Sequence, residues 1–129
     1  MRHTSFKIPI YNLEVTLLQI ESPKDWNEAL VYFKNMKFEK EALDDEQDAI
    51  TRGCTNGGST YRNYDLREFL VVFYPMTDKN SLYNIYGHEK RHVEDRLMEW
   101  GNINDIEASA FIAGFLNERF VKFMLDYKL

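Results

Sequence analysis

The sequence predicts an α+β domain in which helices pack on a largely antiparallel sheet. Short segments rich in β-branched and aromatic residues dominate residues 6–74, one helical pattern interrupts them early, and two long helical patterns follow. The chain has 129 residues, of which 44% are apolar, so it can bury a core without disulfide bonds. We therefore expect residues 1–129 to form a single domain.

The first third of the chain predicts a hairpin followed by a helix. Phe6–Ile10 alternates apolar and polar residues, Tyr11-Asn12 can turn, and Val15–Ile20 is rich in strand formers. Apolar residues recur at helical spacing over Lys24–Met36, which predicts the early helix. The acidic stretch Glu39–Asp48 has little apolar periodicity and is expected to be a solvated linker, with a frayed helical turn as the alternative.

The rest of the chain predicts a second hairpin, a buried strand and two long helices. In Ala49–Tyr64, glycine and asparagine residues separate short segments that contain strand formers, which is the pattern of a hairpin. Glu68–Tyr74 is β-branched and aromatic, and should be the best buried strand. One helix is expected over Asp78–Trp100, ended by a left-handed Gly101, and the other from Asn104 towards Tyr127.

The charge and cysteine content of the chain indicate which classes of partner to exclude and which cellular compartment to expect. Acidic residues outnumber basic ones by 21 to 16, and the formal net charge of −5 argues against nucleic acid and anionic membranes as partners. Cys54 is the only cysteine, which excludes an intrachain disulfide and a cysteine-rich zinc site. The first residues lack a signal-peptide pattern and no apolar run could span a bilayer, so we expect a cytoplasmic protein.

The motif His88-Glu89-x-x-His92 lies inside the first long helix. Residues four apart lie one turn apart on one helical face, so both imidazoles can bind one metal ion. Glu89 is rotated by about 100° from His88 and can act as a base beside the metal's open position. Glu89 also falls within the apolar stripe of this helix, where a cation would offset the cost of burying its charge. Lys90 and Arg91, inside the motif, should face solvent.

Two imidazoles seldom complete a catalytic zinc site, so a third ligand is expected elsewhere. We choose Glu107 at the start of the next helix, because a short turn returns that helix against the first and small residues such as Ala110 allow close approach. Asp105 is a neighbour that could replace it. As a structural alternative, Asn104 and Glu107 would form a capping box, with the carboxylate bonded to backbone amide.

Two blocks, Tyr86–His92 and Asn104–Leu116, resemble the gluzincin-type zinc metallopeptidases, in particular short peptidases of bacteriophages and bacterial mobile elements. The resemblance implies a small zincin-like domain holding Zn²⁺ through His88, His92 and Glu107, with Glu89 as catalytic base. The implied activity is hydrolysis of a peptide or protein substrate, in a bacterial or phage-infected cell, by metal-activated water. It also casts the Phe69–Tyr74 segment as the edge strand along which substrate binds.

Other functions compete with peptide hydrolysis. A catalytically inactive zincin-like module could engage a host or phage protein. A non-haem iron site also uses two histidines and one carboxylate, but it does not require a glutamate directly after the first histidine, so Glu89 would have no role in it. A di-iron site would need a second copy of the Glu-x-x-His pair, which the chain lacks. His88 and His92 could also be plain surface residues of a charged helix.

Overall fold

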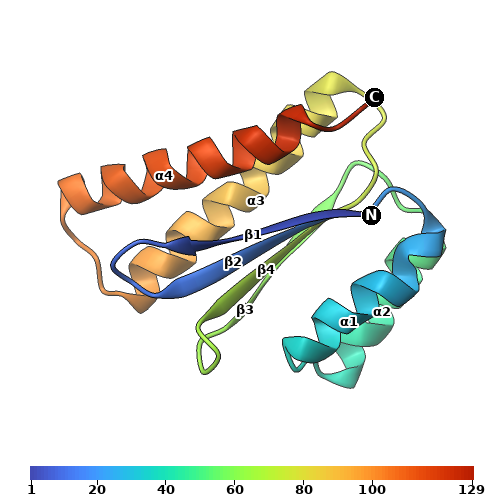
Figure 1. Ribbon diagram of the computed structural model, residues 1–129, viewed down its shortest axis with the longest axis horizontal. Helices are drawn as coiled ribbons and strands as arrows, with labels where there is room; N and C mark the ends of the chain where they lie inside the picture. Colours follow the sequence, from blue (N-terminus) through green and yellow to red (C-terminus); the bar gives the residue numbers. More distant parts are fainter.

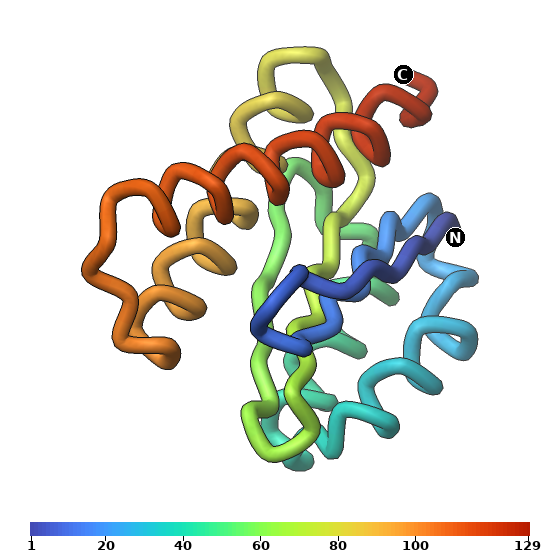
Figure 2. Tube along the Cα trace, turned by 60° about the vertical axis from the view of Figure 1, so that its left-hand side comes forward, coloured from blue at the N-terminus to red at the C-terminus, as the bar shows by residue number.

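The computed structural model describes residues 1–129 and places a four-stranded sheet between two pairs of helices (Figures 1 and 2). One pair, α1 and α2, covers one face of the sheet, and the other pair, α3 and α4, covers the opposite face. The elements are β1 (Arg2–Ile8), β2 (Leu13–Gln19), the 3-10 turn η1 (Pro23–Asp25), α1 (Trp26–Asn35), α2 (Lys40–Thr51), β3 (Gly58–Asn63), β4 (Glu68–Phe73), α3 (Lys79–Trp100) and α4 (Ile106–Leu125).

The sheet is mixed, with strand order β1-β2-β4-β3. β1 pairs with β2 and β3 pairs with β4 in antiparallel fashion, whereas β2 and β4 run parallel. A parallel pair needs a long crossover connection, and here α1, α2 and β3 lie between the two strands in sequence. The α+β class is confirmed, while the largely antiparallel sheet is right for two of the three neighbouring pairs. β1 and β3 are the edges.

The early hairpin and the early helix agree with the sequence prediction. β1 and β2 pair in a register that places Phe6 opposite Val15 and Ile8 opposite Leu13. The turn between the two strands holds Ile10 and Asn12 at positive φ, 75° and 51°. The predicted helix over Lys24–Met36 corresponds to η1 followed by α1.

The prediction of a solvated linker at Glu39–Asp48 is wrong, because all of this stretch after Glu39 lies within α2 and Glu39 directly precedes the helix. Good helix formers fill it, and its buried positions Glu46 and Ile50 face the sheet from one side of the helix. A buried glutamate hid the helical pattern, since a hydropathy reading counts it as polar.

The second hairpin was also misplaced. Residues 49–51 still belong to α2, and the hairpin is made by β3 and β4, which a turn over residues 64–67 joins. Arg67 has a φ of 55° in that turn.

β4 is buried on both faces, which confirms it as the best buried strand. Alternate side chains Phe69, Val71 and Phe73 enter the core beneath α3 and α4. The intervening Leu70 and Val72 enter the core beneath α1 and α2. One short strand therefore joins the two cores.

Glu46 of α2 is a buried carboxylate, 2% exposed, that two phenols hold in place. Tyr61 of β3 and Tyr74, just after β4, both donate hydrogen bonds to it; the Tyr74 distance is 2.8 Å. Two strong donors offset much of the cost of burying this charge. The contact ties α2 to the β3 side of the sheet.

We expect this cluster to make the protein less stable above about pH 10. Burial, followed by the neighbouring Glu46 charge, raises the pKa of both Tyr61 and Tyr74. A raised phenol pKa means that the unfolded chain releases these protons at a lower pH than the folded protein does. The free energy of unfolding therefore falls as the pH rises above the ordinary tyrosine pKa of about 10. Urea unfolding measured between pH 8 and 11 should show this decline, and it should be shallower in a Tyr61→Phe, Tyr74→Phe variant. An equal decline in both proteins would contradict the assignment.

The two long helices lie where the sequence predicts them. α3 begins after Asp78, whose side chain accepts a hydrogen bond from the Ser81 amide, 2.8 Å. The expected left-handed Gly101 is wrong: its φ is −80°, and Asn102 takes the positive φ of 49° instead. No helix combines the length and apolar character needed to cross a membrane.

Candidate metal centre

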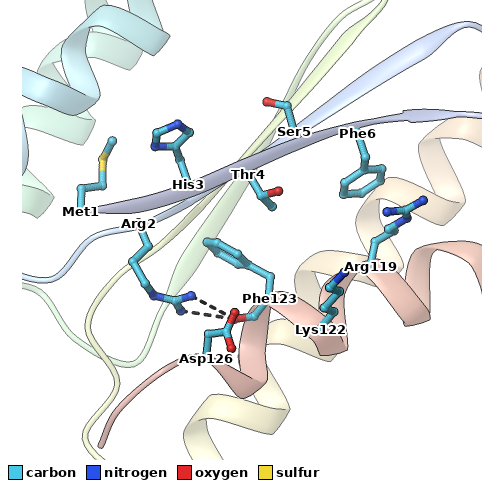
Figure 3. Close-up of a pocket in the computed structure, with 10 residues that line it drawn as sticks. All are labelled: Met1, Arg2, His3, Thr4, Ser5, Phe6, Arg119, Lys122, Phe123 and Asp126. Carbon is cyan, nitrogen blue, oxygen red and sulfur yellow. Dashed lines mark hydrogen bonds between the residues drawn. The ribbon is translucent and has the colours of Figure 1, made fainter.

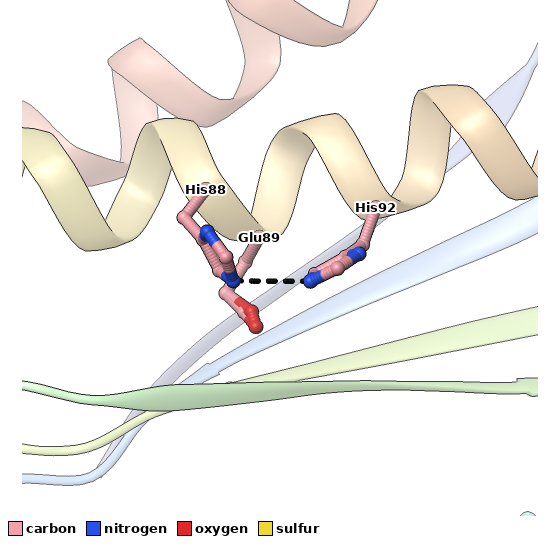
Figure 4. Close-up of side chains that lie close together, drawn as sticks. All are labelled: His88, Glu89 and His92. Carbon is pink, nitrogen blue, oxygen red and sulfur yellow. Dashed lines mark hydrogen bonds between the residues drawn. The ribbon is translucent and has the colours of Figure 1, made fainter.

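The motif residues project from the middle of α3 towards the sheet, on the β3 side (Figure 4). His88 is exposed, His92 is half-buried and Glu89 is buried, with 3% of its surface exposed. The apolar stripe of α3 that includes Glu89 is buried as predicted, since Leu82, Val93 and Leu97 are all core residues. The helical period thus sets which of the three side chains is covered.

The two imidazoles converge at one point. The Nε2 atoms of His88 and His92 lie 3.0 Å apart, and the ring planes are nearly perpendicular. Two nitrogens bound to one tetrahedral zinc ion at about 2.0–2.1 Å would lie about 3.3–3.4 Å apart, so a small opening of the pair suits a shared cation. A hydrogen bond between the two imidazoles gives the same contact, and metal analysis of the purified protein distinguishes the two.

Glu89 completes a three-residue group. One ligand atom from each of His88, Glu89 and His92 lies within 4.8 Å of the others, a spacing at which the three could hold a metal ion. Thr60 of β3 lies against the glutamate, with its hydroxyl 3.5 Å from the carboxylate. The group therefore offers two imidazoles and one carboxylate.

Burial raises the pKa of Glu89, while His92, His88, Arg96 and the Thr60 hydroxyl act in the opposite direction. A glutamate with a raised pKa is a better proton acceptor at neutral pH than an ordinary one. The environment of Glu89 therefore suits acid–base work.

Gly58 of β3 makes room for Glu89. A Cβ at this position would lie 2.8 Å from the Val72 carbonyl oxygen and 3.1 Å from the Glu89 Cγ. The absence of a side chain on β3 allows the strand and α3 to approach closely enough for Glu89 to be buried between them.

Thr60 and Arg96 belong to the site but were not identified from the sequence. Arg96 lies one helical turn beyond His92, and its guanidinium donates to the Thr60 carbonyl oxygen at 2.6 Å. Spacing of four along the helix could have indicated Arg96, because residues 88, 92 and 96 share a face. Nothing in the local sequence indicates Thr60, since only the packing of β3 on α3 brings it there.

Glu107 is not part of the group. It lies exposed in the first turn of α4, and its neighbour Ser109 contacts Met98, 3.2 Å between Oγ and Sδ. Met98 is six residues beyond His92, about 9 Å along the helix axis. In Figure 4, α4 passes on the side of α3 opposite the His88, Glu89 and His92 side chains. The structure therefore does not bring Glu107 to the histidines.

The capping-box alternative for Glu107 is also wrong. Asp105, and not Asn104, caps α4, and its carboxylate accepts from the Ala108 amide at 3.0 Å. Asp105 is thus engaged at the helix end and is absent from the metal-binding group as well. Glu107 remains an exposed carboxylate.

The two basic residues inside the motif behave differently. Arg91 faces solvent as predicted and pairs with Asp95 at 3.0 Å. Lys90 is more covered, with a side chain 22% exposed, and pairs with the buried Glu94 at 3.0 Å. Both are ion-paired along α3 and leave the His88 and His92 side free.

Tyr86 sets the orientation of α3 two residues before His88. Its ring stacks on Phe73 of β4, with centroids 3.7 Å apart and planes 3° from parallel. Its hydroxyl donates to the buried Gln19 at 2.7 Å, and the Gln19 amide in turn donates to the Ile20 and Tyr74 carbonyls. A buried aromatic contact and a satisfied polar network thus anchor the motif helix to the centre of the sheet.

Comparison of the chain with protein-family models, curated proteins and solved structures finds no match.

Proposed function

We propose that this protein is a zinc-dependent peptidase with His88 and His92 as metal ligands and Glu89 as its catalytic base. The observation that carries the proposal is the convergence of two imidazole nitrogens and one buried carboxylate within 4.8 Å on one face of α3. Glu89 is buried against β3, beside the point at which the two imidazoles meet. The single cysteine and acidic composition suit a cytoplasmic protein that acts on a peptide or protein and not on nucleic acid.

The donor set fits zinc, which commonly binds imidazole and carboxylate. A zinc ion held by His88 and His92 would polarise the substrate carbonyl and lower the pKa of bound water to roughly 7. Glu89 would take the proton of the attacking water and return it to the leaving amine. Thr60 and Arg96 would keep the carboxylate oriented, since the first contacts Glu89 and the second holds Thr60.

A catalytic zinc site takes a third protein ligand. The resemblance assigns it to Glu107, which would reach the histidines only if the start of α4 moved relative to α3. Glu89 is the carboxylate that lies with the two histidines, and we assign it as the base and not as the third ligand. Zinc affinity in two variants tests these roles: Glu107→Ala should weaken zinc binding if Glu107 is the third ligand, and Glu89→Ala should leave zinc bound.

We assign substrate binding to the β3 edge instead of the Phe69–Tyr74 segment. β4, which contains that segment, is paired on both sides by β2 and β3 and so has no free edge. β3 has one free edge, and Thr60 in this strand lies beside Glu89. An extended peptide added to β3 would place its carbonyl groups near the base.

His92→Ala should weaken zinc binding by about 100-fold or more, since loss of a direct ligand costs at least as much as loss of its supporting hydrogen bond. Isothermal titration with zinc and elemental analysis of protein purified without chelator provide the measurement. His3→Ala, which removes the one histidine outside the motif, is the matched control and should bind as the parent does. Equal zinc affinity in His92→Ala would end the proposal of a metal centre.

A second candidate is a zincin-like binding module without catalysis. The exposed position of Glu107, away from the histidines, favours it, because a two-histidine site lacking its third protein ligand holds metal less firmly. A chain that binds zinc but hydrolyses none of a broad mixture of unfolded protein substrates would support this candidate over the peptidase.

A further inference from the structure

β1 forms the sheet edge opposite β3, and a groove of about 520 Å³ runs along it (Figure 3). Residues 2–6 of the strand line the groove from both faces of the sheet. Arg2 and Phe6 project towards α4, and Ser5 projects towards the other side, as Figure 3 shows. The hollow therefore follows the edge itself, over a length that suits five residues of extended chain.

The groove is basic although the chain as a whole is acidic. Arg2, Arg119 and Lys122 line it, and none of them has a carboxylate within 4.0 Å. The ion pairs at the groove are those of the Met1 ammonium, which lies 2.8 Å from Glu21 and 3.3 Å from Asp25. Asp126 is the only acidic residue of the lining. Three cations without an ionic partner in one groove of a protein with a net charge of −5 favour an anionic ligand.

Two of these cations are held in place by aromatic rings. The Arg2 guanidinium lies 4.5 Å from the centre of the Phe123 ring and donates to the Phe123 carbonyl oxygen at 3.3 Å. The Arg119 guanidinium lies 5.1 Å from the Phe115 ring and 5.9 Å from the Phe6 ring. Stacking of this kind reduces the freedom that each side chain would lose on binding a carboxylate.

A second copy of this chain is a poor occupant of the edge. If β1 paired antiparallel with another β1 about Ser5, the Arg119 and Lys122 side chains of the two copies, which line this same edge, would approach each other. Like charges opposite one another destabilise a strand pair. The edge thus resists self-pairing while its backbone stays open to a chain of the opposite charge.

We propose that the β1 edge binds an extended acidic peptide segment by strand addition. Backbone hydrogen bonds to β1 supply the pairing, and carboxylates of the segment meet Arg119 and Lys122 of α4 and Arg2 of β1. The strand order separates this edge from β3 by three strand spacings, about 14 Å, so the site is distinct from the metal centre. The inference stands whether or not the protein is a peptidase.

Binding of a fluorescent peptide tests the proposal. The probe is an acetylated, fluorescently labelled seven-residue peptide that alternates glutamate and valine. Its binding is followed by fluorescence anisotropy at low salt, on a protein in which Glu89 is replaced by Gln so that any cleavage is slow. Arg119→Glu, Lys122→Glu should weaken binding about tenfold or more, since facing charges now repel. Lys24→Glu, Lys34→Glu makes the same change in net charge on the exposed surface of η1 and α1 and should bind the probe as the parent does.

A second probe separates strand addition from simple ionic attraction. The same peptide with alternate amides N-methylated keeps its charges but cannot pair along an edge, so its binding should be lost. Hydrogen exchange of residues 2–7 should slow with the first probe only. Four results would each overturn the proposal. They are no binding of the first probe, binding by the Arg119→Glu, Lys122→Glu variant equal to that of the parent, equal binding of the methylated peptide, and a dimer through β1 in sedimentation.

Discussion

Glu89→Gln is expected to leave zinc bound and to reduce peptide hydrolysis by about 100-fold to 10,000-fold, the usual contribution of a positioned acid–base group. Glutamine keeps the shape of the side chain that Gly58 and Thr60 surround, but it cannot accept the water proton. The measurement is the rate at which cleaved fragments of a mixed, unfolded protein substrate appear by mass spectrometry, together with the zinc content of each protein.

Unfolding can be separated from loss of chemistry in this variant. Burial raises the pKa of Glu89, which means that the folded state disfavours its charged form, so a neutral glutamine should not lower the thermal midpoint at neutral pH. Glu99→Gln changes an exposed glutamate of the same helix and serves as the matched control. Undiminished hydrolysis in Glu89→Gln would show that Glu89 is not the base.

Phe73→Ala should lower the free energy of unfolding by about 3–5 kcal/mol, the range for deleting a fully buried phenylalanine. Phe73 has no exposed surface, stacks face to face on Tyr86 and meets Phe120 edge to face with centroids 6.3 Å apart. Its loss would leave a cavity where the central strand meets both long helices. Urea unfolding followed by far-UV circular dichroism measures the change.

The same substitution should also disturb the metal centre, because Tyr86 lies one half-turn before His88 on α3. Phe111→Ala is the control: Phe111 is 50% exposed, so this change should alter stability by no more than about 0.5 kcal/mol. A cost below about 1 kcal/mol for Phe73→Ala would mean that the stack does not anchor α3 as described.

The elements predicted correctly from the sequence are those whose signal is local. The first hairpin, β4 and the two long helices follow from alternation, β-branched content and helical spacing, all of which act over a few residues. The convergence of His88 and His92 belongs to this group, because the helix period alone places side chains four apart on one face. The burial of Glu89 followed from its place in the apolar stripe.

The errors arose where distant residues decide the outcome. α2 was read as a linker because the side chain that packs inward is Glu46, and only Tyr61 and Tyr74, from other elements, make its burial tolerable. The resemblance cast Phe69–Tyr74 as the edge strand that binds substrate, and this is wrong, because β2 and β3 flank the strand. The sequence of the segment cannot reveal which strands lie beside it.

The amino-acid sequence by itself determined that two imidazoles and a glutamate share one turn of helix, since backbone geometry guarantees it. The tertiary structure decided what surrounds them: Thr60 and Arg96 are brought in by the packing of β3 on α3, and Glu107 is kept away by where α4 meets the end of α3. The reason is that the helical repeat depends only on residues close together in the chain. The neighbours of a site depend on how elements far apart in sequence pack together to fill the core.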